Sequence, residues 1–432
     1  MKSFKKLLVL IILGGLLAAA ITYFRDTAAP VVQLTPTQGP VSANMPLSLK
    51  LTDEGSGLKS LRVEAIQGGN RQLLLTQDFP AQTPEFRLEL SLSDKKLQDG
   101  PLAIEVTSVD RAIYHLGQGN RIQVQFAFNY DSRAPIISIL SRAHNFRHGG
   151  AGLVRYQLNE EVEQTGVQVG EHFFPGFRQS NGDFVALAAW PWNLPEKDFI
   201  PRVMARDLAG NERHSGIYYH SIARKFRQRT ITLSDTFLQQ KAPEFEPLAP
   251  GLTEPLDIFL KVNSEVRAEN RQKMKDLAQQ TAASPLWQGE FGRQPNASTL
   301  AIFADDRDYR YQGKVVDHAT HLGYDLASVA RAEVLSANNG KVIFADYLGI
   351  YGQCVVIDHG LGLQTLYAHM SQIDVAPGDQ VTKNQIIGRT GATGMAGGDH
   401  LHFGVFIGGL AVQPLEWWDA SWLENNISSK LQ

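Results

Sequence analysis

The stretch AGGDHLHFGV, residues 396–405, contains two histidines separated by one residue. It lies between glycines and an apolar run that favours a strand, in which successive side chains point to opposite faces. His400 and His402 are therefore predicted to point the same way, and Leu401 and Phe403 the other way. Two imidazoles on one face can bind a metal or move protons. An H-x-H also arises by chance in a chain with 12 histidines, so further residues are needed.

Two more stretches in the last third of the chain supply such residues. HLGYD places His321 four residues before Asp325, with Gly323 between them to allow a tight turn. YAHM places His369 at the end of a strand-like run, and Tyr367 is predicted to lie on the same face of that strand. All three stretches fall in a region predicted to form one β domain, so their side chains can converge on one site.

These residue types predict a catalytic zinc site. Zinc binds imidazole nitrogens and carboxylate oxygens, and a catalytic site uses three protein ligands and leaves a position for water. His321 and Asp325 supply two ligands, and one histidine of the H-x-H pair supplies the third. The other histidine of the pair and His369 then face the same space, where they can move a proton or stabilise an oxyanion. The chain has no H-E-x-x-H motif, so a histidine is predicted to replace the usual glutamate base.

Composition narrows the alternatives. The chain has 432 residues, enough for about two to four domains. Its formal net charge of −3 gives no support to nucleic-acid binding, and no nucleic-acid partner is expected. Cys354 is the only cysteine in the sequence, which excludes an intrachain disulfide, four-cysteine zinc sites and iron–sulfur clusters. A metal site must therefore use His, Asp or Glu.

The region that must position the histidines is rich in glycine and in short β runs. Examples are GKVIFADY, GQCVVIDHG, LQTLYAHM and HLHFGVFI, and APGDQV provides a Pro-Gly turn between two such runs. This pattern predicts a compact antiparallel β domain at residues 285–420, followed by a tail at residues 421–432.

A repeat marks the first half of the chain. DTAAPVVQL, which begins at Asp26, returns as DSRAPIISI, which begins at Asp131. Each copy opens a segment of short strand-like runs with turns at the spacing typical of a β-sandwich, and the second segment nears its end at the polar turn ARDLAGNE. The segments resemble the bacterial Ig-like domains found in tandem on envelope proteins, which implies two β-sandwich domains, at residues 26–128 and 129–225. We expect them to be spacers or docking platforms for envelope proteins.

The first 25 residues predict a membrane segment. Three lysines among the first six residues precede an uncharged, mostly apolar run from Leu7 to Phe24, about the minimum length of a spanning helix. An uncleaved anchor in the inner membrane is favoured, with the lysines in the cytoplasm and the rest of the chain on the other side. A cleaved signal peptide is the alternative, because residues 18–20 are alanines that could form a cleavage site.

Residues 226–284 are predicted to form a helical connector. Four prolines precede NSEVRAENRQKMKDLAQQT, in which Ser264 is a candidate N-cap. A packing helix is favoured over a partner-binding helix, because charged residues surround a sparse apolar face made of Val266, Met274, Leu277 and Ala278. The whole chain is thus predicted to be mostly β, with two Ig-like sandwiches, this connector and a C-terminal antiparallel β-sheet domain.

The C-terminal motifs resemble those of a known family. HLGYD, YAHM and HLHF, in this order, match the H-x-G-x-D, Y-x-H and H-L-H-F motifs of the lysostaphin-type (LytM) zinc metallopeptidases, which cleave cross-bridges and stem peptides of peptidoglycan. FADDRDY and APGDQVTKNQIIGRTGATG match as well, and the resemblance covers roughly residues 285–420. Ala304 stands where relatives usually have glycine after the phenylalanine, and we expect it to change the local turn little.

The resemblance implies a role for each key residue. It makes His321, Asp325 and His402 the Zn²⁺ ligands, and His369 and His400 the catalytic histidines. It implies a zinc-dependent endopeptidase that cleaves peptide cross-links of bacterial peptidoglycan, in which zinc-activated water attacks the scissile amide and the two histidines assist. Together with the predicted anchor, it places the protein in the bacterial inner membrane with most of the chain in the periplasm.

Other residues in the region are expected to have structural roles. Tyr367 could hydrogen-bond near the catalytic histidines or simply pack. His318 is expected to be a solvated loop residue, although it could line the cleft. His359 is expected to close a hairpin, and Cys354 to be a small buried residue.

Two other functions stay open. Some members of the family have lost zinc ligands and activate other cell-wall hydrolases, whereas all five key residues are present here. The chain could also be an envelope scaffold whose Ig-like domains bind glycan or a protein partner. A scaffold would keep its function after substitution of His402, and a hydrolase would not.

Overall fold

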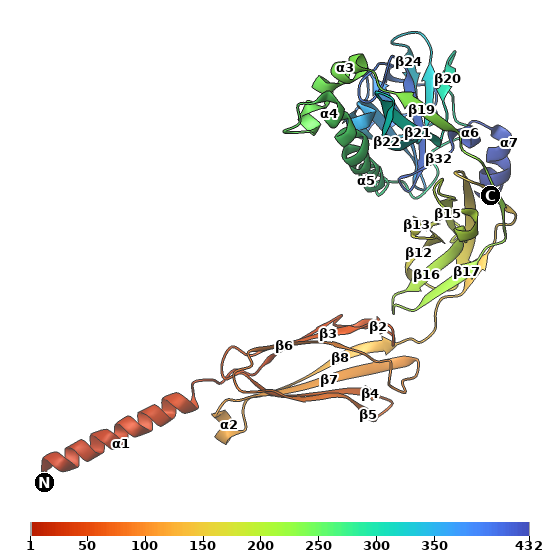
Figure 1. Cartoon of the computed structure of the whole chain (residues 1–432). Coiled ribbons are helices and arrows are strands. Elements are labelled where there is room, and N and C mark those ends of the chain that lie inside the picture. The colour runs from red at the N-terminus through yellow and green to blue at the C-terminus, as the bar shows by residue number, and fades with distance from the viewer. Residues whose placement is uncertain (1, 432) are drawn as a thin grey trace. The chain divides into compact units, whose positions relative to one another are not determined.

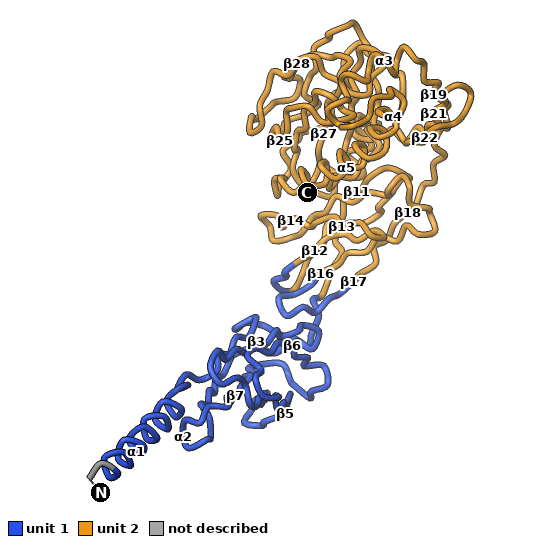
Figure 2. Tube along the Cα trace, turned by 60° about the vertical axis from the view of Figure 1, so that its left-hand side comes forward, with its two compact units in different colours: residues 1–135, 160–163, 206–213 blue, residues 136–159, 164–205, 214–432 orange. Residues whose placement is uncertain are grey.

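The computed structural model describes residues 2–431, which fall into two compact units (Figure 2). Met1 and Gln432, to which the predicted terminal segments extend, lie outside the described residues. Strands make up most of the regular structure in both units, so the predicted mostly β fold is confirmed. Unit 1 comprises residues 1–135, 160–163 and 206–213, and unit 2 comprises residues 136–159, 164–205 and 214–432.

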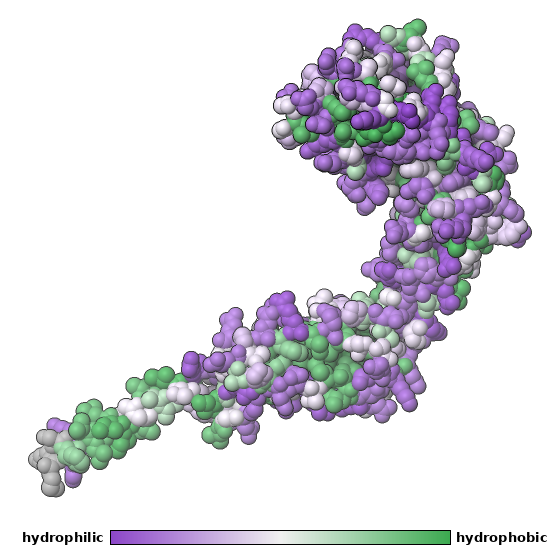
Figure 3. Space-filling view, in the orientation of Figure 1, coloured by the Kyte–Doolittle hydropathy of each residue, from purple (hydrophilic) through white to green (hydrophobic). Residues whose placement is uncertain are grey.

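The N-terminal helix α1 (Lys2–Tyr23) is apolar over most of its length. From Phe4 to Tyr23 it is long and apolar enough to cross a membrane, and none of this stretch is buried against the rest of the protein. Figure 3 shows that the exposed surface of α1 is mostly apolar. Its length and composition fit either a membrane anchor or a signal sequence.

Unit 1 contains two sheets whose apolar faces share one core. Their elements are β1 (Val31–Thr35), β2 (Gly39–Val41), β3 (Leu47–Thr52), β4 (Leu58–Gln67), β5 (Asn70–Asp78), β6 (Glu85–Leu90), β7 (Gly100–Asp110), the short helical turn α2 (Tyr114–Gly117) and β8 (Arg121–Tyr130). One sheet has the order β1–β3–β6 and the other the order β2–β8–β7–β4–β5. Alternate residues such as Leu49, Val63 and Ile104 are buried in this core, as expected for packed sheets with one face each toward solvent.

The two copies of the repeat are fixed in the same way. In the first copy, Asn120 Nδ2 donates a hydrogen bond of 2.7 Å to the Asp110 carboxylate and also bonds main-chain oxygens near the start of the repeat. In the second copy, Asn211 Nδ2 donates to the Asp207 carboxylate and to the main-chain oxygen of Asp131, both at 3.0 Å. Each asparagine therefore ties the beginning of a repeat to the loop after one of its last strands.

The strands after residue 136 form further antiparallel sheets. They are β9 (Ile137–Ile139), β10 (His144–Arg147), β11 (Ala151–Leu158), β12 (Val162–Val169), β13 (His172–Pro175), β14 (Phe177–Arg178), β15 (Phe184–Ala189), β16 (Arg202–Asp207), β17 (Glu212–Gly216) and β18 (Tyr219–Ile222). One sheet has the order β14–β15–β11–β9 and another the order β13–β12–β16–β17, while β10 pairs in parallel with β18. Trp190 and Phe199 stack in the core, with ring centroids 4.5 Å apart.

The C-terminal half of unit 2 is built around one large sheet (Figure 1). Its order is β20 (Ser298–Ala301), β23 (Tyr324–Ala327), β31 (Leu401–Ile407), β27 (Leu363–Met370), β26 (Gln353–Gly360), β25 (Gly340–Tyr347) and β29 (Gln380–Val381), with β32 (Leu410–Val412) paired to β31. Two smaller sheets accompany it, with the orders β19 (Gln228–Thr232), β21 (Asp305–Tyr311), β22 (Lys314–His321) and β24 (Glu333–Leu335), β30 (Ile386–Arg389), β28 (Gln372–Ile373). Short helices end the chain: α6 (Pro414–Trp417), α7 (Ala420–Leu423) and α8 (Ser429–Leu431).

The stretch predicted as a connector is helical over most of its length. It contains α3 (Asp235–Phe245), α4 (Pro255–Lys261) and α5 (Arg267–Leu277), which lie together on one side of the C-terminal half (Figure 1). Before them, β19 pairs in parallel with β21, so the first residues of this stretch are a strand of the C-terminal half. The alternating sequence QRTIT suits that strand.

The start of the long helix differs from the prediction. A π-helical turn, residues 262–266, joins α4 to α5, so Ser264 lies inside a continuous helical stretch. The Ser264 hydroxyl bonds to the main-chain oxygen of Leu260 at 2.8 Å, and the prediction that it caps the helix is wrong. Pro255 begins the helix instead, because its fixed φ suits the first helical position. Val266, Met274 and Leu277 are buried, as the apolar pattern predicted.

One hydrophobic cluster runs through the two halves of unit 2. It extends from Phe146 to Ile427 and includes side chains from β11, β15, β27 and β31. Polar contacts reinforce it: the Glu416 carboxylate accepts a hydrogen bond from the Ala151 main-chain nitrogen at 3.0 Å. The main-chain oxygen of Gly149 accepts a hydrogen bond from the Gln413 main-chain nitrogen at 2.8 Å. The two halves therefore stabilise each other.

Glu416 makes this junction sensitive to pH. The residue is 4 % exposed, and burial raises the pKa of its carboxyl to about 8. Between pH 4.5 and 8 the folded protein keeps a proton that the unfolded chain has lost, so its free energy of unfolding falls as pH rises. The side chain of Glu416→Gln stays neutral at every pH. Between pH 5 and pH 8 we therefore expect the free energy of unfolding to fall by about 1–3 kcal/mol less in this variant than in the unmodified protein.

Urea unfolding of both proteins at the two pH values measures this difference. Glu424→Gln, which changes an exposed carboxylate in the same C-terminal segment, is the matched control and should follow the unmodified protein. Equal pH dependence of the Glu416→Gln and unmodified proteins would show that Glu416 does not titrate in this range.

Candidate metal centre and active site

Three neighbouring strands bring His321, Asp325 and His402 together. His321 ends β22, and the turn Leu322–Gly323 leads directly into β23, which carries Asp325. β23 pairs antiparallel with β31, and their register places Asp325 opposite His402. The H-x-G-x-D and H-x-H motifs are therefore joined by a single strand pair, which fixes their separation.

Gly323 is required by close contact as well as by the turn. A Cβ atom at this position would lie 2.5 Å from His402 Nε2 and 2.7 Å from the main-chain oxygen of Phe403. The sequence explained this glycine by the turn alone. The structure shows that any side chain here would displace the His402 ring.

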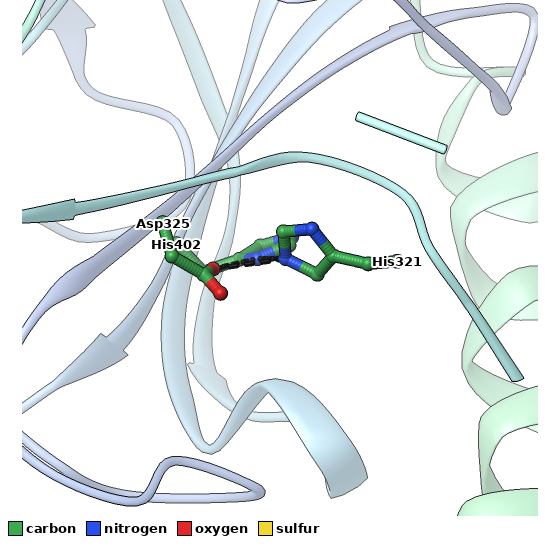
Figure 4. Close-up of side chains that lie close together, drawn as sticks. All are labelled: His321, Asp325 and His402. Carbon is green, nitrogen blue, oxygen red and sulfur yellow. Dashed lines mark hydrogen bonds and ion pairs between the residues drawn. The ribbon is translucent and has the colours of Figure 1, made fainter. Parts of the chain in front are cut away.

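The side chains of His321, Asp325 and His402 point toward one another (Figure 4). Asp325 Oδ1 lies 2.9 Å from His321 Nε2 and 2.8 Å from His402 Nδ1, and these two nitrogens lie 3.0 Å apart. His321 Nδ1 donates to the main-chain oxygen of Ile302 at 2.9 Å, which leaves Nε2 as the free nitrogen. All three residues are largely buried, with side chains 6–14 % exposed.

This arrangement fits a metal ion. Three ligand atoms of a tetrahedral zinc with bonds of about 2.0–2.1 Å lie roughly 3.3 Å apart, close to the separations of 2.8–3.0 Å found here. Two imidazole nitrogens and a carboxylate oxygen are also the donor types that zinc prefers. Without a cation, two nitrogens that both face one oxygen would need protons to avoid repulsion. The group satisfies the spacing and the chemistry of a three-ligand site.

His369 and His400 lie beside this group. Their ring centroids are 4.9 Å apart, and the His369 ring is 5.7 Å from that of His402. The Nδ1 atoms of His369 and His400 each lie 2.8 Å from a main-chain oxygen, of Thr393 and Gly398 respectively. Donation from Nδ1 leaves Nε2 of each ring to face the site, and His400 Nε2 lies 3.6 Å from Asp325 Oδ1.

The backbone of His369 decides where its side chain points. Regular alternation along β27 would place His369 on the side of Tyr367, which is paired with Phe403 across the strands. His369 instead has φ 63°, a left-handed conformation that turns its ring to the side of His400 and His402. Tyr367 stays on the other side, where its ring packs edge-on against Phe403. The prediction that Tyr367 and His369 share a face is wrong.

Tyr367 therefore has a packing role. Its hydroxyl accepts hydrogen bonds from the Ala337 main-chain nitrogen at 2.7 Å and from the Thr365 hydroxyl at 3.1 Å, and the residue is 1 % exposed. These contacts hold β27 against the loop after β24 rather than orient a catalytic histidine.

Burial sets the protonation states of the site. Burial lowers the pKa of His402 to about 4 and lowers that of His369 well below its usual value, so both rings are neutral near pH 7. Burial alone would raise the pKa of Asp325, but His321, and then His400 and His402, hold it well below its usual range. Asp325 is therefore charged and His402 neutral, the forms in which these two residues bind metal.

A cavity of about 340 Å³ opens over these residues. The five predicted site residues all line it, together with Tyr351 and Met395. The opposite wall was not predicted from the sequence. It comes from the helical stretch and β21 and is formed by Phe237, Phe259, Arg267, Arg271, Arg307 and Tyr309. The spacing of Arg267 and Arg271 was the available signal, since residues four apart lie on one face of a helix.

The remaining histidines and Cys354 lie outside the cavity lining. His318 is in strand β22 rather than a loop, and its half-exposed ring contacts Asp306 and Asp308 at 2.7 and 3.0 Å. His359 is buried near the turn between β26 and β27, where it lies 2.7 Å from the Thr365 hydroxyl. Cys354 is fully buried in β26, as predicted.

Residues 319–414 match the sequence model of Peptidase family M23. The C-terminal part of the chain is an M23 peptidase domain. The predicted resemblance to lysostaphin-type peptidases is thereby confirmed, and the M23 match together with the His321–Asp325–His402 group confirms the predicted Zn²⁺ cofactor.

Individual relatives of the M23 domain share about a third of its residues. The DD-carboxypeptidase/endopeptidase Mpg of Neisseria meningitidis serogroup B is 38 % identical over 95 residues, 22 % of this chain and 22 % of Mpg. The murein hydrolase activator EnvC of Escherichia coli is 33 % identical over 109 residues, 25 % of this chain and 26 % of EnvC. The chain thus matches about a quarter of the length of these relatives. Among solved structures, a zinc-containing peptidase from Vibrio cholerae superposes with a TM-score of 0.29 and 16 % identity, over 73 % of this chain and 81 % of that one.

Ala304 adopts a conformation that favours glycine. It has φ 61°, is 1 % exposed, and its main-chain nitrogen donates to the main-chain oxygen of His321 at 2.7 Å. The turn before His321 therefore forms with alanine in the left-handed region, which costs an L-residue about 1–2 kcal/mol.

We expect Ala304→Gly to raise the free energy of unfolding by about 0.5–1 kcal/mol, because relief of the left-handed strain exceeds the added entropy of the unfolded chain. Chemical denaturation at pH 7 measures the change. Ala345→Gly, in the extended strand β25, is the control, and its free energy of unfolding should fall by about 0.5–1 kcal/mol. Destabilisation of similar size in both variants would mean that Ala304 is not strained.

Proposed function

We propose that this protein is a zinc-dependent endopeptidase that hydrolyses peptide cross-links in bacterial peptidoglycan. The observation that carries the proposal is the convergence of three ligand atoms and two further imidazoles in one cavity of an M23 domain. The name of the relative Mpg, a DD-carboxypeptidase/endopeptidase, supports this choice of reaction.

The five polar residues divide into two roles in this proposal. His321 Nε2, Asp325 Oδ1 and His402 Nδ1 would hold Zn²⁺, which when bound supplies Lewis acidity to activate water and polarise the scissile carbonyl. His369 and His400 act through their Nε2 atoms, because Nδ1 of each is occupied by a main-chain oxygen. One of them accepts the proton of the attacking water at Nε2. The Nε2–H formed in this way donates a hydrogen bond to the oxyanion, and the same proton then passes to the leaving amine.

We also propose a location and an arrangement for the chain. Helix α1 serves as a single anchor in the inner membrane, and the rest of the chain lies in the periplasm. Residues 26–128 and 129–225 are Ig-like β-sandwiches that act as spacers and could dock envelope proteins, residues 226–284 connect them to the peptidase domain at 285–420, and 421–432 is the tail. The packed sheets and the matching Asn120 and Asn211 contacts support the repeat.

A second function is favoured by one comparison. EnvC, which shares 33 % identity with the M23 region, is named a murein hydrolase activator. The present chain could likewise activate another hydrolase without cutting peptide bonds itself. Its complete set of ligand and catalytic residues favours hydrolysis, and the two functions respond differently to loss of the metal.

The test is digestion of purified cross-linked peptidoglycan by the full-length protein in detergent, followed by mass spectrometry of the released muropeptides. We expect cross-linked dimers to disappear, and a zinc chelator to stop the reaction. His402→Ala should reduce the rate by at least about 100-fold and should also lower the zinc content of the purified protein, since one of three ligands is removed.

His318→Ala is the matched control, because this histidine is exposed and lies outside the cavity. It should keep both zinc and activity. A folded, zinc-loaded protein that yields no product, but accelerates another cell-wall hydrolase, would replace the endopeptidase proposal with the activator function.

A further inference from the structure

The wall of the cavity that faces the metal group belongs to this chain's helical stretch. Phe237 of α3, Phe259 of α4, and Arg267 and Arg271 of α5 line it. In Figure 4 a pale green helix of this stretch lies beside His321. The family match begins at residue 319, so these residues come from outside it.

The helices are fixed to the domain by an apolar cluster. Leu233, Leu238, Phe259, Tyr309 and Ala319 pack together, and the Phe259 and Tyr309 rings meet edge-on with centroids 5.4 Å apart. This cluster joins α3 and α4 to strands β21 and β22. The helical stretch is therefore packed firmly against the domain and forms one wall of the cavity, and Arg267 and Arg271 have defined positions in that wall.

Positive charge dominates this cavity. Arg267, Arg271 and Arg307 are its cationic side chains, and Asp325 is the carboxylate that lines it. Arg307 lies 3.5 Å from Asp325 Oδ2. A bound Zn²⁺ would add two further positive charges to the same space.

Arg267 is held in place without a counter-charge. Its Nε and Nη2 donate to the main-chain and side-chain oxygens of Asn263, at 3.0 and 2.5 Å, and Nη2 also lies 3.4 Å from Met395 Sδ. Asn263 is in turn fixed by a hydrogen bond of 2.7 Å to Asp317. Across the described part of the chain, no carboxylate lies within 4.0 Å of Arg267 or Arg271.

Unpaired guanidinium groups beside a cationic metal are unfavourable unless an anion joins them. Burial is the main cause that lowers the pKa of Arg267; Tyr309 and Tyr351 oppose it, and the positive charges of Arg271 and Arg307 lower the pKa by less. A carboxylate would offset these positive charges, and a guanidinium can bind a carboxylate through two parallel hydrogen bonds. The peptide stems of peptidoglycan carry free carboxylates close to their cross-links.

We propose that Arg267 and Arg271 bind a free carboxylate of the substrate peptide next to the scissile amide, so that the enzyme selects acidic stem peptides over amidated ones. This inference rests on the proposed endopeptidase function, because it assigns the substrate class of the same site. Arg267 and Arg271 are specificity residues here, and the metal ligands and the two catalytic histidines keep their roles.

The test compares two substrates: native cross-linked peptidoglycan, and the same material with its carboxylates converted to amides by carbodiimide and ammonia. The full-length protein and Arg271→Met are assayed on both. Arg271 is exposed, so its substitution should leave the fold intact. We expect the unmodified protein to prefer the native substrate by at least tenfold in kcat/KM, mainly through KM. Arg271→Met should lose that preference and match the unmodified protein on the amidated substrate.

Lys273→Met removes an exposed positive charge from the same helix outside the cavity and should behave as the unmodified protein. Arg271→Lys, which keeps the charge but not the bidentate geometry, should recover part of the preference. Equal preference in Arg271→Met and the unmodified protein would overturn the inference. Faster cleavage of both substrates by Arg271→Met would overturn it too, and would make α5 a cover over the site. An unmodified protein inert on both substrates would overturn the proposed function and this inference with it.

Discussion

The main constraint on the C-terminal half of this protein is the closeness of three buried side-chain atoms, Asp325 Oδ1, His321 Nε2 and His402 Nδ1, which lie within 3.0 Å of one another. A carboxylate oxygen and two ring nitrogens resist such closeness unless a cation or protons lie among them, and side chains on mobile loops would move apart. The chain meets the constraint with strand pairing: the β23–β31 register sets Asp325 against His402. Gly323 has no Cβ atom, and a Cβ atom at this position would collide with the His402 ring. The buried sheet that surrounds the site makes the arrangement rigid.

The same constraint accounts for local strain near the site. His369 and Ala304 both have positive φ, at 63° and 61°. The conformation of His369 turns its imidazole out of the regular alternation of β27. The conformation of Ala304 closes the turn in which its main-chain nitrogen donates a hydrogen bond to the His321 main-chain oxygen. Residues in this region of conformational space persist when their surroundings determine them fully, and such residues cluster at functional sites. Here the surrounding sheet provides the stability that offsets them.

The sequence predicted that His321, Asp325 and His402 come together, because its motifs are local. H-x-G-x-D and H-x-H each fix two side chains within five residues, and strand alternation predicts correctly that His400 and His402 share a face. Strand alternation gave the wrong face for His369, because the positive φ of this one residue turns its ring away from the face of Tyr367. No residue type in the sequence indicates that change. The mostly β fold followed from the short alternating runs. The spacing of Arg267 and Arg271 predicts only that they share a helix face; that this face lines the cavity depends on the tertiary packing of α5.

The hydrophobic cluster shared by the two halves of unit 2 has a mechanical consequence. Phe146 and the strands around it share a core with Ile427 and the sheet that carries the histidines, so residues 136–159 and 164–205 are packed directly onto the part of the chain that holds the cavity. A displacement of these strands would therefore move the walls of the cavity with them, because, among the described residues, no solvent-filled linker separates the two halves of this core.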